Sequence, residues 1–98
     1  MRRGTTPTLT FALDVTFESL DSAYLTIRQS GRELTLEKDR MQAVEGGFSV
    51  RLTQEETLSL MADADCRVQL RAISGGEAIA SNIVQIPVGR ILMDGVIE

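Results

Sequence analysis

The chain has 98 residues, a formal net charge of −4, a single cysteine and no histidine. A chain of this length forms one domain that buries roughly 60 to 65% of its unfolded surface, which is enough to fold without disulfides. The missing histidine and the lone cysteine exclude zinc clusters and nucleophilic triads, and an acidic balance with no basic stripe disfavours nucleic acid as a partner.

The sequence predicts neither secretion nor membrane insertion. Residues 1–3 are basic, but Gly4 to Thr8 is polar where a signal peptide needs an apolar core. No apolar run approaches the length of a transmembrane helix. We therefore expect a cytoplasmic protein at synthesis, with no membrane as partner.

Residues 1–7 are expected to form a flexible arm, and a first strand follows it. From Thr8 to Leu13 apolar and polar residues alternate, which is typical of a strand with one buried face. Pro7 has no amide hydrogen and therefore suits the beginning of a strand.

The next segments predict a hairpin. Ser22 to Gln29 and Arg32 to Glu37 alternate in the same way, and Gly31 supplies the turn between them. The charged residues 38–40 then suggest a solvated connection, after which Met41 and Val44 are expected to contact the core.

A strand and a short helix are expected next. Gly47 to Leu52 alternates as a strand, and Thr53 with Glu56 three residues later forms a capping box. The helix is expected near residues 54–61, with Leu58 and Met61 on its apolar side.

The firmest prediction is an antiparallel hairpin from Cys66 to Val88, turning at residues 74–77. In its second arm the apolar residues change face near Ser81 and Asn82, which predicts a bulge there. Cys66 is expected to be a small buried hydrophobic residue at the start of the first arm.

Six or seven short strands, two hairpins and one short helix predict an all-β fold, an immunoglobulin-like antiparallel β-sandwich. An open barrel is the second candidate. The sandwich is expected to span residues 8–88.

No residue pattern predicts catalysis, and no catalytic, cofactor-binding or metal-binding residue is assigned. Asp63 and Asp65 could in principle hold a hard cation, but no calcium-loop spacing surrounds them, so solvated loop acids are the preferred interpretation. The glycine pairs at 46–47 and 75–76 lack the lysine and helix of a phosphate-binding loop. We expect a protein that is not an enzyme.

Residues 89–98, GRILMDGVIE, are too apolar for a segment that simply extends into water. Two interpretations remain open: this segment is the last strand of its own sandwich, or it docks on a neighbouring subunit. The candidate partner-binding residues are Ile91, Leu92, Met93, Val96 and Ile97.

Several segments together resemble a family. RRGTTPTLTF, LTQEETL, QLRAISGGEAIASNI, and VGRIL with DGVI are similar to short prophage-encoded proteins of Gram-positive bacteria. In outline the chain also resembles the amino-terminal domain of phage baseplate upper proteins. The resemblance implies a structural role in or near a phage tail, and it lends no catalytic residues.

The sequence thus favours a non-enzymatic phage structural or assembly protein. Its expected partners are other phage structural proteins or further copies of itself, in the host cytoplasm or in the virion. The alternative is a stand-alone recognition module that binds a host protein or carbohydrate through loops such as 29–32 and 74–77. An enzyme with an acid-only active site is the weakest interpretation.

Overall fold

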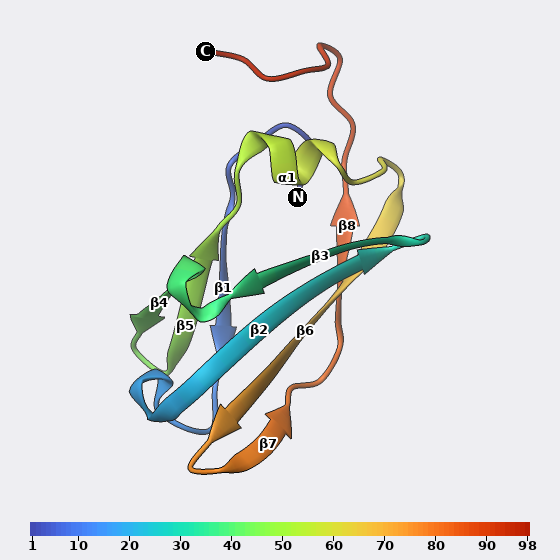
Figure 1. Ribbon diagram of the computed structural model, residues 1–98. Coiled ribbons are helices and arrows are strands. Elements are labelled where there is room, and N and C mark those ends of the chain that lie inside the picture. Colours follow the sequence, from blue (N-terminus) through green and yellow to red (C-terminus); the bar gives the residue numbers. More distant parts are fainter.

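A computed structural model describes residues 1–98 as two antiparallel sheets packed face to face (Figure 1). The smaller sheet has the strand order β1 (Thr8–Ala12), β5 (Gly47–Arg51), β4 (Met41–Val44). In the larger sheet β3 (Arg32–Glu37), β2 (Leu20–Gln29), β6 (Ala64–Ser74) and β7 (Glu77–Ala80) follow in order, and β8 (Val84–Val88) also pairs with β6. The helices are η1 (Phe17–Ser19), η2 (Lys38–Arg40) and α1 (Gln54–Leu58).

The chain changes sheets three times, and each crossing contains one of these helices: η1 between β1 and β2, η2 between β3 and β4, and α1 between β5 and β6. The order β1-β5-β4 corresponds to strands B, E and D of an immunoglobulin domain, and β3-β2-β6-β7/β8 to strands C′, C, F and G. The predicted immunoglobulin-like sandwich with one short helix is therefore confirmed. No strand lies beside β1 in the place of strand A.

The core forms where the alternating apolar faces of the two sheets meet. Phe48 of β5 lies at its centre, with its ring centroid 5.3 Å from that of Phe11 and 6.1 Å from that of Phe17. Cys66 of β6 is completely buried, as predicted, and burial raises the pKa of its thiol. The apolar residues buried in this core are Leu20, Ala23, Leu25, Ile27, Leu36, Met41, Phe48, Val50, Leu52, Leu60, Cys66, Val68, Leu70, Ala72 and Val88.

The predicted bulge in the second arm of the hairpin is present. Arg71 pairs with Ala80 and Val68 pairs with Val84. The chain therefore advances three residues along β6 but four residues from β7 to β8, which leaves one extra residue in the second arm. The Ser81 hydroxyl accepts a hydrogen bond from the Leu70 amide at 3.0 Å. The extra residue changes the phase of the side chains, so that Ile79 before it and Ile86 after it both pack against the core.

Two local predictions were wrong. Residues 41–44 form strand β4, which the preceding charges concealed, and although Met41 is buried, Val44 is exposed. The helix ends at Leu58, so Met61 lies outside it and is exposed. The residue that α1 buries is Thr57, whose hydroxyl donates a hydrogen bond of 2.8 Å to the Thr5 carbonyl.

A buried amide side chain fixes the connection from α1 to β6. The Gln29 amide nitrogen donates to the carbonyls of Met61 and Ala64 at 2.8 and 3.1 Å, and its oxygen accepts from the Met61 amide at 2.6 Å. Gln29 is 3% exposed, so water cannot reach its amide side chain to take over the hydrogen bonds with Met61 and Ala64.

Replacing this side chain with an isosteric apolar one, Gln29→Leu, is expected to lower the free energy of unfolding by about 2 to 3 kcal/mol, because it leaves buried polar groups unpaired. Urea denaturation measures the change. Gln42→Leu, at an exposed position on β4, is the matched control and should change the value by less than about 0.5 kcal/mol. Equal midpoints for the two variants would contradict this account of Gln29.

Candidate functional site

Residues 89–98, the tail segment, leave the sandwich after β8 and extend past α1 (Figure 1). They add no strand to either sheet of their own domain. Four of the five candidate partner-binding residues are more than half exposed: Leu92, Met93, Val96 and Ile97. The structure therefore leaves these four apolar side chains in water.

The fifth candidate, Ile91, is different because it packs on its own domain. It is partly buried, and its Cδ1 atom lies over Gly4, together with the side chain of Leu58. A Cβ atom at Gly4 would lie 2.9 Å from Ile91 Cδ1, and the φ angle of Gly4 is +70°, so this contact requires glycine.

Polar contacts hold the main chain of the tail segment. The Gln54 side chain of α1 donates to the Ile97 carbonyl and accepts from the Ile97 amide, both at 2.9 Å. Arg90 pairs with Asp63 at 2.5 Å, and Arg3 pairs with Asp94 at 3.3 Å. The segment is thus held at the end of the domain while Leu92, Met93, Val96 and Ile97 stay exposed.

The first residues of the chain lie against the start of the tail segment. Arg2 and Gly89 form a parallel bridge, and the Gly89 amide donates to the Met1 carbonyl at 2.6 Å. The Arg3 guanidinium donates to the carbonyls of Leu58 and Leu60 at 3.0 and 2.7 Å. Part of the segment expected as a flexible arm, residues 1–7, therefore connects α1 with the tail segment.

An open groove of about 640 Å³ lies on the side of the sandwich where β1 faces β7 and β8. We call it the lateral groove. Most of its lining is apolar, and Asp14 is the single carboxylate in it. Its lining residues are Phe11, Ala12, Leu13, Asp14, Val15, Leu25, Phe48, Val68, Gln69, Leu70, Ile79, Ala80, Ser81, Asn82 and Val84.

The two loops considered as a recognition site do not come together. Leu20 at the start of β2 pairs with Ser74, whereas Gln29 ends the same ten-residue strand. Ten strand residues span about 30 Å, so residues 29–32 and 74–77 lie at opposite ends of the sheet. One ligand of ordinary size cannot contact both.

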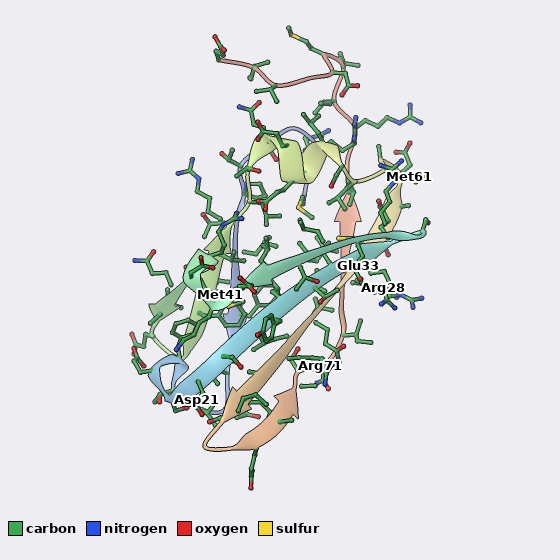
Figure 2. The ribbon with its side chains drawn as sticks, in the orientation of Figure 1. Asp21, Arg28, Glu33, Met41, Met61 and Arg71 are labelled. Carbon is green, nitrogen blue, oxygen red and sulfur yellow. The ribbon has the colours of Figure 1, made fainter.

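The outer face of the larger sheet carries mostly polar side chains, together with the exposed Tyr24 and Ile73. Arg28 and Glu33 point toward one another from β2 and β3 (Figure 2), with 2.7 Å between Nη2 and Oε1. Thr26 and Thr35 share a hydrogen bond of 3.1 Å on the same strands. These cross-strand pairs satisfy one another and form no concave site.

No group of three or more acidic, cysteine or histidine side chains is arranged to hold a metal ion. Asp63, one of the two acids considered for a cation, is instead the ion-pair partner of Arg90. None of the helices has the length and apolar character needed to cross a bilayer.

Comparisons of the chain with protein-family models, with curated proteins and with solved structures find no match. The prophage resemblance therefore stays a prediction, and the structural features that bear on function are the tail segment and the lateral groove. The tail segment was visible in the sequence as an apolar run. The lateral groove was not, because it depends on which strand edges stay unpaired.

The helix that holds the tail segment depends on its capping box. The Thr53 hydroxyl accepts from the Glu56 amide at 3.2 Å, and Glu56 accepts from the Thr53 amide at 2.8 Å. Arg40 binds both oxygens of the same carboxylate, at 2.7 and 2.9 Å. The hydrogen bond from Arg40 is the main reason that the pKa of Glu56 is lowered, and burial opposes it.

Because the pKa of Glu56 is lower in the folded state, its stabilisation is complete above the ordinary value of 4.5 and is lost as the pH falls through the lowered pKa. Near neutral pH, Glu56→Gln should lower the free energy of unfolding by about 1 kcal/mol. That difference should shrink in acid below the ordinary value. Urea titrations at a series of pH values measure it, with Glu45→Gln, an exposed acid in a turn, as the control. A difference that does not change with pH would contradict this role of the carboxylate.

Proposed function

We propose that this chain is a non-enzymatic structural or assembly protein that acts through protein–protein contacts of its tail segment. The observation that carries the proposal is the exposure of Leu92, Met93, Val96 and Ile97 on a segment whose main chain is held by polar contacts. Contiguous exposed apolar residues mark interaction sites on otherwise soluble domains.

The energetics fit a contact that is repeated in an assembly. Burying one such side chain contributes about 1.5 to 3 kcal/mol, so two contribute about 3 to 6 kcal/mol and all four about 6 to 12 kcal/mol. The lost freedom of the two partners costs an estimated 4 to 15 kcal/mol. A single contact is therefore weak, and many identical contacts in a symmetric particle would make it sufficient.

The proposed setting is a phage tail or baseplate, with other structural proteins of the particle or further copies of this chain as partners. It is supported by the resemblance of the RRGTTPTLTF, LTQEETL and VGRIL segments to prophage-encoded proteins. The two-sheet sandwich is also the fold implied by the resemblance to the amino-terminal domain of phage baseplate upper proteins.

The test is the solution mass of the 98-residue chain by light scattering over a range of concentrations. The fourfold variant Leu92→Ser, Met93→Ser, Val96→Ser, Ile97→Ser removes the exposed apolar side chains without touching the core. We expect the parent chain to associate as its concentration rises and this variant to remain a folded monomer.

The matched control replaces two exposed apolar residues elsewhere, Val44→Ser and Met61→Ser, and should associate like the parent. If the tail variant and the parent have the same mass at every concentration, the tail segment does not mediate self-association, and that form of the proposal is wrong.

A further inference from the structure

One side of the lateral groove is an unpaired strand edge. The Leu13 amide donates to the Gly46 carbonyl, and the Leu52 amide donates to the Pro7 carbonyl. Antiparallel bonding alternates with a period of two residues, so the main-chain groups of Thr8, Thr10 and Ala12 point away from β5. Since β1 is the end of its sheet, these groups face the groove side.

The opposite side of the groove is a second unpaired edge. The Ser81 amide donates to the Leu70 carbonyl at 2.9 Å, which directs the odd-numbered main-chain groups of β7 toward β6. Those of Ala78 and Ala80 therefore point outward. The two edges flank one groove whose floor is formed by apolar side chains of the core, among them Phe48 and Leu70.

This place corresponds to that of strand A in an immunoglobulin domain, beside strand B and near strand G. A strand inserted there would pair its main chain with β1 and bury one face on the exposed side of the core. Exposed edges of this kind normally carry charges or proline that prevent pairing, but Thr8, Thr10 and Ala12 are neutral.

The tail segment has the pattern that such a strand needs. In an extended conformation Ile91, Met93 and Ile97 share one face with Gly95, while Leu92, Asp94 and Val96 share the other. The first face carries no charge and suits the groove floor. The second carries the one acid of this stretch and suits the solvent side.

The segment and the groove lie at different ends of a molecule 45 Å long. The tail segment starts at Gly89, next to Met1 and α1, whereas the groove is lined by the ends of β1 and β7 and by the bulge (Figure 1). The pairing of Met1 and Arg3 with Gly89 directs the segment away from the groove of its own chain. The occupant that fits is the segment of a second copy.

We propose that the tail segment of one copy adds as a strand to β1 of the next copy, with Met93 and Ile97 buried in its lateral groove. Because donor and acceptor are different surfaces, the contact is head-to-tail and generates a ring or a filament rather than a twofold dimer. This inference rests on the proposed function and names the partner surface.

The first test blocks the groove edge. Ala12→Pro removes the Ala12 amide hydrogen and puts the proline ring on the groove side of β1, which blocks an added strand. The Ala12 amide makes no hydrogen bond to β5, so the substitution breaks no pairing within the sheet. Ala43→Pro is the matched control, since Ala43 lies on the outer strand β4 of the same sheet and its amide also points outward. We expect light scattering to show loss of association for Ala12→Pro only.

The second test is chemical cross-linking between two copies. A donor copy carries Leu92→Cys and Ala12→Pro, and an acceptor copy carries Asn82→Cys with the four serine substitutions of the tail segment. Cys66 is completely buried and stays in place. A short bis-maleimide should link donor to acceptor in the mixture. An acceptor with Thr35→Cys, which is exposed on β3, should give at least tenfold less product.

The outcomes separate the two proposals. Suppose that the variant with four serines in the tail segment, the serine tail variant, is a monomer, whereas Ala12→Pro associates like the parent. If the Asn82→Cys acceptor also links no better than the Thr35→Cys acceptor, the tail segment mediates assembly but the lateral groove does not bind it. If the serine tail variant also associates like the parent, the proposed function fails with it. Selective linking with loss of association in Ala12→Pro supports both.

Discussion

The antiparallel pairing of β2 with β6 is the interaction on which the rest of the structure depends. It runs through eight residue pairs from Leu20–Ser74 to Arg28–Arg67 and joins the two halves of the chain. The alternation within this pair sends Leu25, Ile27, Val68 and Leu70 into the core. The smaller sheet then packs on that face. Because β6 is longer than either partner strand on its far side, β7 and β8 share its edge and meet at the bulge.

The unpaired edges follow from the same arrangement. The smaller sheet contains three strands, so β1 pairs on one side only, and the larger sheet ends at β7 and β8. The side chains between these edges come from the core, which explains why the lateral groove is apolar although it is open. The tail segment at the other end of the molecule presents the complementary chemistry. A chain that carries an apolar segment at one end and an apolar groove at the other has the asymmetry that head-to-tail assembly requires.

The sequence was sufficient to predict most of the local structure. Strands β1, β2, β3 and β5 follow from two-residue alternation, the start of α1 follows from the Thr53–Glu56 capping box, and the bulge follows from the change of phase near Ser81. These signals are local, so a single sequence contains them.

Two local predictions failed, one of them because of a contact between distant residues. Met61 was expected on the helix, but Gln29, thirty-two residues earlier, holds the chain in a different conformation there. Strand β4 pairs with β5 across a two-residue turn, and its four residues, MQAV, are too few to show a clear alternation. The tail segment was recognised from its composition, whereas the groove could not be, because unpaired edges are a property of the whole strand order.

Amide hydrogen exchange at Ala12 is the sharpest test of strand addition, because this amide faces the groove and makes no bond to β5 within its own chain. At concentrations where the chain associates, we expect this amide to be protected at least tenfold in the parent and to exchange freely in the variant with four serines in the tail segment. The Ala43 amide on the outer edge of β4 should exchange equally in both. Equal exchange at Ala12 in an associated parent and in the dissociated variant would contradict strand addition at this edge.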